Sequence, residues 1–295
     1  MRNFPSHFWQ LFQEKKDDDS FIVVDDQGES FTETYWEWTR RVQRIAVSFL
    51  ESGLKAGERV GLIAPNSGHW FDVAFGAWLA GGVLVPISSD ADRQTTLHCL
   101  GRSGSNWIVV RDASAYHRIR GQGASLPEGL HWLLVDWDGE TSPGDATTLT
   151  QFEEEGRSLV ARGRVDDLAE RIYELDPTRP SLILYEEPPG DDPHGAFYTG
   201  DRLAEMLENL GASLPFGADT RLAIQGSLSN PRSFLLGVAA LMEGHVLTVG
   251  ESGGALTAHL DTVQPTHLVC DADYLLRKTK RWRRRIEDAP EFLQG

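Results

Sequence analysis

The chain has 295 residues, of which 40% are hydrophobic and 24% are charged, and its formal net charge is −16. These totals are those of a globular protein with one large domain or two small ones. The acidic balance argues against general binding of nucleic acid or of an anionic membrane by the whole surface.

We expect a cytoplasmic protein without a transmembrane segment. No apolar run approaches the roughly 20 residues that a membrane-spanning helix needs. Residues 1–5 lead into an aromatic amphipathic stretch that has no apolar signal core. Cys99 and Cys270 are the only cysteines, and no CxxC or Cys/His spacing occurs. We therefore expect reduced thiols and no metal site of the zinc type.

The first elements are a helix and a hairpin. The spacing of Phe8, Leu11 and Phe12 predicts a short helix over residues 7–15. Two apolar runs around a turn at residues 26–28 predict a hairpin.

A second helix follows, with Thr32 or Thr34 as its cap and Gly53 at its end. Apolar residues recur along it at spacings of three and four, which predicts one buried face. This face comprises Tyr35, Trp38, Val42, Ile45, Ala46 and Phe49. Arg40, Arg41 and Arg44 lie on the other face, which we expect to be exposed to solvent.

Short apolar runs then alternate with helical patterns. Strands are predicted at 59–64, 83–87, 106–110 and 131–135, with helices before Gly81 and over 94–102. This alternation predicts a parallel sheet with helices on its faces. Residues 138–148 are expected to form a surface loop, and residues 149–175 are acidic and weakly helical. We expect His98 and Cys99 to serve packing within their helix.

The pattern recurs in the second half of the chain. Residues 58–62 match 220–224, and residues 82–87 match 244–249, both at an offset of 162. Each half is therefore predicted to be a β-α-β-α-β unit. The similarity reflects either shared ancestry or only the structural rules that all such α/β halves follow. The turn before Pro180 is the best internal boundary, which gives a first α/β subdomain over 1–176 and a second over 177–295.

Residues 185–200 hold the central contradiction of the sequence. A strand, a loop rich in proline and glycine, and a helix over 202–210 are the layout of a phosphate-binding loop. However, the loop carries four carboxylates: Glu186, Glu187, Asp191 and Asp192. Asp191, Asp192 and His194 are candidates for a metal site, although the polarity of a loop explains them as well.

Four segments together resemble the acyl-CoA synthetase branch of the adenylate-forming, or AMP-binding, superfamily, and the resemblance covers nearly the whole chain. They are residues 31–60, 64–86, 185–200 and 241–266. The resemblance implies an α/β fold made of two doubly wound βαβ subdomains, which is part of the N-terminal domain of that family. It also implies a reaction in which ATP and Mg²⁺ convert a carboxylic acid to an acyl-adenylate, which then passes to coenzyme A.

The phosphate loop of that family reads Y-T-S-G-T-T-G-x-P-K-G, and this chain aligns with it without a gap. The family's nucleotide-binding positions correspond to Tyr185, Gly190, His194, Gly195 and Thr199. Tyr185, Gly195 and Thr199 match, as does the proline, whereas His194 replaces the lysine. The resemblance also places a histidine of the acyl and nucleotide pockets where this chain has Asn230. The adenine motif and the catalytic lysine would lie beyond residue 295. We therefore expect no catalytic residue and no bound cofactor in this chain.

Three functions are compatible with these observations. The first is a truncated, catalytically degenerate acyl-CoA synthetase homologue that acts as a binding or interaction module, with self-association, a partner protein or an acyl ligand. The second is one lobe of a split or longer ligase that activates a fatty or other carboxylic acid. The third is an acidic loop that holds a cation or a cationic partner. A basic segment at 277–285 suits a membrane surface, an acidic partner or a helix exposed to solvent.

Overall fold

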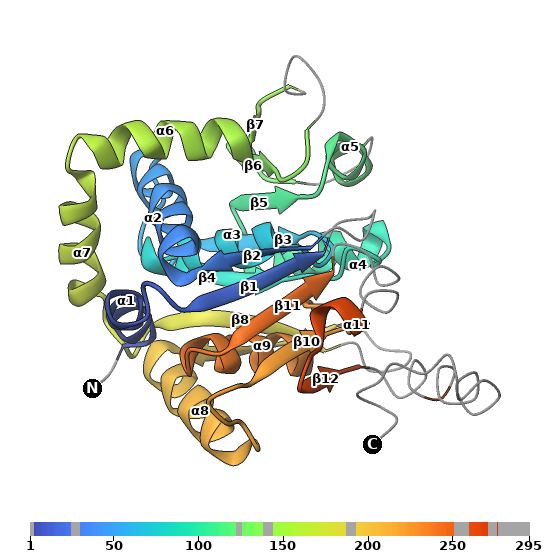
Figure 1. The fold of residues 1–295 in the computed structure, drawn as a ribbon. Helices are drawn as coiled ribbons and strands as arrows, with labels where there is room; N and C mark the ends of the chain where they lie inside the picture. Colours follow the sequence, from blue (N-terminus) through green and yellow to red (C-terminus); the bar gives the residue numbers. More distant parts are fainter. Residues whose placement is uncertain are drawn as a thin grey trace. The chain divides into compact units, whose positions relative to one another are not determined.

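The computed structural model describes residues 3–24, 30–121, 126–137, 144–186, 193–250, 260–270 and 276. The chain folds into two compact units, each assembled from several stretches of the sequence, which the colours of Figure 1 follow from the N-terminus to the C-terminus. The first unit contains residues 1–14, 38–65 and 69–206, and the second contains the remaining residues. Residues 277–285 lie outside the part that the structure describes.

The first unit is built on a seven-stranded sheet with the order β7-β6-β5-β3-β4-β8-β9. All neighbouring strands are parallel except β8 and β9, which are antiparallel. The strands are β3 (Arg59–Ile63), β4 (Val83–Pro86), β5 (Trp107–Val110), β6 (His131–Leu134), β7 (Ala146–Thr148), β8 (Pro180–Glu186) and β9 (His194–Thr199). The prediction of a surface loop over 138–148 was therefore wrong at residues 146–148, where β7 extends the sheet.

The helices of the first half are α1 (Phe4–Glu14), α2 (Tyr35–Glu51), α3 (Gly68–Leu79), α4 (Arg93–Ser103), α5 (Ala113–Arg120), α6 (Leu149–Ala161) and α7 (Arg164–Glu174). The sequence did not predict α5, and the weakly helical stretch became two helices. Thr34 rather than Thr32 caps α2, because the Glu37 amide donates to its hydroxyl at 3.3 Å. The Glu37 carboxylate accepts from the Thr34 amide at 2.9 Å, which completes a capping box.

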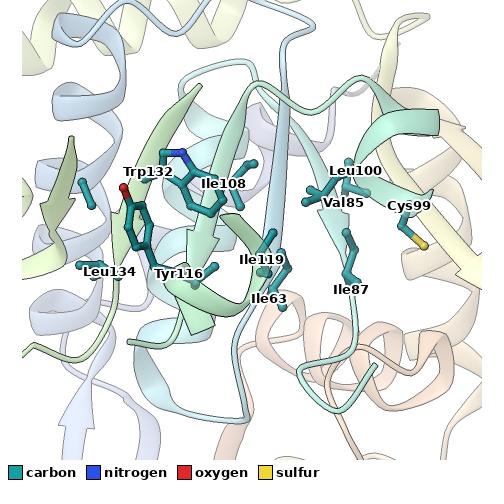
Figure 2. Close-up of a cluster of buried hydrophobic side chains, with 12 residues drawn as sticks. Ile63, Val85, Ile87, Cys99, Leu100, Ile108, Tyr116, Ile119, Trp132 and Leu134 are labelled. Carbon is teal, nitrogen blue, oxygen red and sulfur yellow. The ribbon is translucent and has the colours of Figure 1, made fainter. Parts of the chain in front are cut away.

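Side chains alternate between the two faces of this sheet, as the period of a strand requires. On one face Ile63, Val85, Ile108 and Leu134 join the residues of α4 and α5 in a buried cluster (Figure 2). On the other face Trp107 packs edge-on against Phe49 of α2, with ring centroids 5.2 Å apart. The sheet is therefore covered on both faces, as the alternation of elements predicts.

Aromatic rings fix α1 to the first unit. Phe8 lies 3.9 Å from Phe75 of α3 between ring centroids, and Phe4 lies 4.6 Å from Trp78. The Trp78 indole donates to the Ser181 carbonyl of β8 at 2.7 Å. Burial of such rings is worth roughly 1.5–3 kcal/mol each, and the contact with Ser181 places the start of β8 beside α3.

The second unit has a five-stranded sheet with the order β12-β10-β11-β1-β2. Its strands are β1 (Asp19–Val24), β2 (Ser30–Thr34), β10 (Arg221–Ile224), β11 (Val246–Gly250) and β12 (His267–Val269). Among the described residues, this half of the chain has the helices α8 (Gly200–Ser213), α9 (Pro231–Met242) and α11 (Leu260–Val263). The predicted hairpin near the N-terminus is confirmed as the antiparallel pair β1 and β2.

The internal repeat extends further than the sequence indicated. The order β1-β2-α2-β3-α3-β4-α4-β5 recurs as β8-β9-α8-β10-α9-β11-α11-β12. Each sheet has three parallel strands from one repeat and the hairpin of the other repeat. Both sheets therefore cross the boundary expected between residues 176 and 177, because β8 and β9 join the first sheet while β1 and β2 join the second.

Candidate functional site

The segment that the sequence presents as a loop is largely a hairpin. Strand β8 ends at Glu186, β9 begins at His194, and α8 follows at Gly200. The expected arrangement of strand, loop and helix is corrected here, because residues 194–199 pair with β8 instead of remaining in a loop. Gly190, Asp191 and Asp192 lie outside the described residues.

Tyr185 and Gly195 face each other across this hairpin. A Cβ atom added to Gly195 would lie 3.1 Å from the Tyr185 ring, so the two residues are in close contact. Burial raises the pKa of the Tyr185 phenol above its usual value, and a hydrogen bond to Ser103 and the charge of Arg102 partly oppose this rise. The pair therefore holds the hairpin against α4.

The structure gives two other predicted site residues local structural roles. The Thr199 hydroxyl donates to the carboxylate of Asp201, at the junction of β9 and α8. Asn230 belongs to the second unit, where its side chain accepts from the Arg232 amide at 2.9 Å and caps α9. In this structure Asn230 thus serves the start of a helix.

His194, Gly195 and Tyr185 share the wall of a cavity of about 930 Å³ in the first unit. This cavity, which we call the α4 cavity, lies between the C-terminal half of α4 and one face of β8 and β9. Its basic lining residues are Arg59, His98, Arg102, Arg179 and His194, and its apolar ones include Val83, Ile183 and Phe197. Among the described residues that line it there is no carboxylate, although the chain as a whole is strongly acidic.

Sequence reasoning did not identify the α4 cavity. His98 was assigned to packing, and Arg102 was not considered, although the two are one helical turn apart and so share a face of α4. That spacing was the available signal. What the sequence did not contain is the position of β8 and β9, which form the opposite wall.

A second group of charges lies at the start of α3. Asp72 is fully buried, and its carboxylate accepts from Arg41 Nε at 2.7 Å and lies 3.0 Å from His69 Nδ1. Burial raises the pKa of Asp72, but Arg41 and His69 outweigh it and lower that pKa overall. The hydrogen bond to Asp72 raises the pKa of His69, against the opposing effect of burial. This arrangement is an internal ion pair with a partly exposed imidazole at its edge.

The arginines of α2 therefore correct one expectation. Arg41 pairs with Asp72, and Arg44 Nη1 lies 2.7 Å from Glu153 of α6. The face predicted to be exposed to solvent is instead partly covered by α6. A Cβ atom on Gly156 of α6 would lie 2.1 Å from the Arg44 carbonyl oxygen, so only glycine allows this approach.

Asn66 organises two turns of the second unit. Its side-chain amide donates to the Gly226 carbonyl at 2.8 Å, and its oxygen accepts from the Leu228 amide at 2.8 Å. The proline-asparagine-serine segment of the sequence thus has a defined role, which is to fix the turn that follows β10.

The described residues contain no group of three or more histidine, cysteine, aspartate or glutamate side chains arranged to hold a metal ion. No helix among them is long and apolar enough to cross a membrane.

Comparisons with known proteins agree on one family. A family model described as AMP-binding enzyme matches residues 9–200. The probable acyl-activating enzyme 16 of Arabidopsis thaliana is 25% identical over 226 residues, which is 72% of this chain and 30% of the relative. The fatty acid–[acyl-carrier-protein] ligase ScoC of Streptomyces coeruleorubidus is 32% identical over 156 residues, which is 49% of this chain and 30% of the relative. The matches thus span under a third of these relatives.

Solved structures show the same fold at low sequence identity. The coronafacic acid ligase of Pectobacterium brasiliense superposes with a TM-score of 0.79 at 14% identity, over 98% of this chain and 54% of that one. VinN superposes with a TM-score of 0.73 at 18% identity, over 98% of this chain and 66% of that one. These similarities confirm the α/β fold with parallel sheets that the sequence predicts.

Proposed function

Because the chain belongs to the AMP-binding enzyme family, we propose that it is a homologue of acyl-CoA and acyl-carrier-protein ligases whose phosphate loop no longer holds ATP. In this proposal it is a pseudoenzyme that retains the scaffold of acyl or fatty acid activation and acts as a binding or interaction module. The observation that carries the proposal is the composition of residues 186–192 on an otherwise retained hairpin.

Electrostatics favour this proposal. A phosphate loop binds through backbone amides, hydroxyls and a cation, whereas this one contributes Glu186, Glu187, Asp191 and Asp192. At an effective dielectric constant near 20, two like charges about 4 Å apart repel by roughly 4 kcal/mol. Pro188 and Pro189 also remove two amide donors. A triphosphate would therefore be repelled at this position.

The groups beside the loop support the same conclusion. Tyr185 and Gly195 pack on each other, and Thr199 is hydrogen-bonded to Asp201. Asn230, which stands where the family has a histidine, caps α9. The structural contacts of these residues support a proposal in which the fold is retained and nucleotide binding is not.

The proposal includes association with a partner through exposed edge strands. Phe197 of β9 is 68% exposed and Phe31 of β2 is 57% exposed, and both strands lie at the edges of their sheets. Exposed aromatic residues on unpaired edge strands favour association with a second copy or with another protein. Light scattering after size exclusion tests this, and a monomer at all concentrations would contradict self-association.

A second candidate is supported by the relatives themselves, whose printed names are ligases and acyl-activating enzymes. In that case the chain supplies one lobe of an enzyme that activates a carboxylic acid. The distinguishing experiment is exchange of labelled pyrophosphate into ATP with a panel of fatty and aromatic acids. We expect no exchange above the rate without protein, and acid-dependent exchange would favour the ligase.

A further inference from the structure

We propose that the α4 cavity binds a small aromatic anion, whose charged group is held by His98 and Arg102 and whose ring lies on β8 and β9. This inference goes beyond the proposed function and does not depend on it, because the lining residues that carry it lie outside residues 186–192.

Two basic side chains of α4 line the cavity. His98 is half-buried, Arg102 is exposed, and neither is hydrogen-bonded or ion-paired to any other residue that the structure describes. Other arginines of the same unit are paired with acids, such as Arg44 with Glu153 and Arg164 with Asp167. Two neighbouring basic groups without such partners, which face a cavity with no carboxylate in its described lining, favour an anionic ligand.

Hydrogen bonds hold the wall that carries Arg102 in place. Arg59 Nε donates to the Ser103 carbonyl at 2.8 Å, and the Ser103 hydroxyl donates to the Cys99 carbonyl at 2.8 Å. The last turn of α4 is therefore tied to β3 and to its own preceding turn. Arg59 is committed to this role, and Arg179 Nε lies 3.9 Å from the carboxylate of Asp176, so Arg102 is the guanidinium of the described lining that is available to a ligand.

Side chains of β8 and β9 form an apolar floor of the cavity. Ile183 is paired with Phe197, and Tyr185 with Gly195, across the hairpin. Gly195 has no side chain, and the Tyr185 ring lies over it, so that ring is part of the floor. Phe197, which is 68% exposed, also lines the cavity. A floor with two rings and a basic wall fits an aromatic body with a phosphate or carboxylate group.

The volume of the cavity favours an aromatic anion over a single inorganic phosphate. Cavities that bind small organic molecules measure roughly 300–1,000 Å³, and the α4 cavity measures about 930 Å³. A single inorganic phosphate would leave most of the apolar floor uncovered. An aromatic anion uses the basic wall and the floor together.

The test is calorimetric titration of the intact chain with phenyl phosphate, benzoate, phenol and inorganic phosphate. We expect phenyl phosphate or benzoate to bind saturably, and to bind at least about tenfold more tightly than either phenol or inorganic phosphate. The difference between the two aromatic anions identifies the charged group. Equal affinity for inorganic phosphate and phenyl phosphate, or no saturable binding of either aromatic anion, would overturn the proposal.

Variants locate the site. Arg102→Ala should weaken binding about tenfold and Arg102→Lys by less, because lysine keeps the charge but loses the planar fork. Phe197→Ala should weaken binding of the aromatic anion without changing that of inorganic phosphate. Arg157→Ala is the matched control, because Arg157 is an exposed arginine of α6 that does not line the cavity. Equal effects of Arg102→Ala and Arg157→Ala would contradict the assignment.

ATP in the same titrations separates this proposal from the previous one. ATP binding that persists in Arg102→Ala would contradict the proposal that the phosphate loop no longer holds ATP. It would leave the cavity proposal standing. A wild-type chain that binds neither the aromatic anions nor ATP would overturn the cavity proposal and leave the phosphate-loop proposal standing.

Discussion

The first unit contains two groups of basic side chains that differ in their surroundings. Arg41 and His69 converge on the buried carboxylate of Asp72. His98 and Arg102 face the α4 cavity, whose described lining contains no acid. The comparison separates charges that stabilise the fold from charges that are available to a ligand, although both groups lie on helices that pack on the same sheet.

This difference follows from the burial of the acid. A carboxylate that is removed from water must be paired, so Asp72 requires its basic neighbours for folding. An exposed guanidinium remains hydrated, so folding does not require a partner for it. Substitutions in the first group should therefore change stability, and substitutions in the second should change binding.

The largest effect is expected from Asp72→Ala. It leaves the partly buried Arg41 without its carboxylate, and breaking a buried ion pair lowers the free energy of unfolding by about 3–5 kcal/mol. Chemical denaturation measures this loss. Asp167→Ala is the control, because Asp167 forms an exposed pair with Arg164 that is worth at most about 1 kcal/mol. Similar losses in both variants would remove the distinction between the two groups.

A double substitution sharpens the same point. Arg41→Met alone should destabilise the chain by a similar amount, because Asp72 is then buried without its main partner. Arg41→Met combined with Asp72→Leu should recover most of that loss, since apolar replacement of a whole buried pair is often close to neutral. A double variant that is less stable than either single variant would contradict this account.

A smaller effect with a defined pH dependence is expected from His69→Ala. The folded-state pKa of His69 is raised by Asp72, so its stabilising contribution is complete below about pH 6.5 and is lost as the pH rises through the raised pKa. Because His69 is half-exposed, we expect at most about 1 kcal/mol. Denaturation of both proteins at acid and alkaline pH measures it. A difference that grows toward alkaline pH would contradict the sign.

The pKa of Asp72 sets the lower limit of the pH range in which the pair of His69 and Asp72 stabilises the fold. That pKa is lowered in the folded state, so its contribution is present above the usual range of an aspartate and is lost as the pH falls through the lowered value.

The smallest effect on stability is expected from Arg102→Ala. The exposed side chain has no acid partner among the described residues, so the free energy of unfolding should change by no more than about 0.5 kcal/mol. Thermal denaturation without added anions measures this. A loss comparable to that of Asp72→Ala would show that Arg102 stabilises the fold instead of serving a ligand.

Local periodicity predicted the buried face of α2 well. All six apolar positions predicted for α2 are fully buried: Tyr35, Trp38, Val42, Ile45, Ala46 and Phe49. The same periodicity failed for Arg41 and Arg44 because it does not indicate which distant acid approaches the other face. Glu153 reaches Arg44 only because Gly156 allows α6 to contact α2.

The candidate site was predicted only in part for a related reason. The residues of the hairpin were identified from one continuous segment, including Tyr185, His194 and Gly195. The α4 cavity needs His98 and Arg102 from a segment about 90 positions earlier, and the pairing of β8 with β4 brings these segments together. No local pattern contains that pairing.

The central claim is that the family scaffold is retained while its phosphate loop has lost the ability to hold ATP. The direct measurement is calorimetric titration of the chain with ATP and Mg²⁺, beside the neutralised variant E187Q/D191N/D192N. We predict no wild-type binding tighter than about 1 mM, with any affinity higher in the variant. A wild-type dissociation constant for ATP well below about 1 mM, which the neutralising substitutions leave unchanged, would contradict the account.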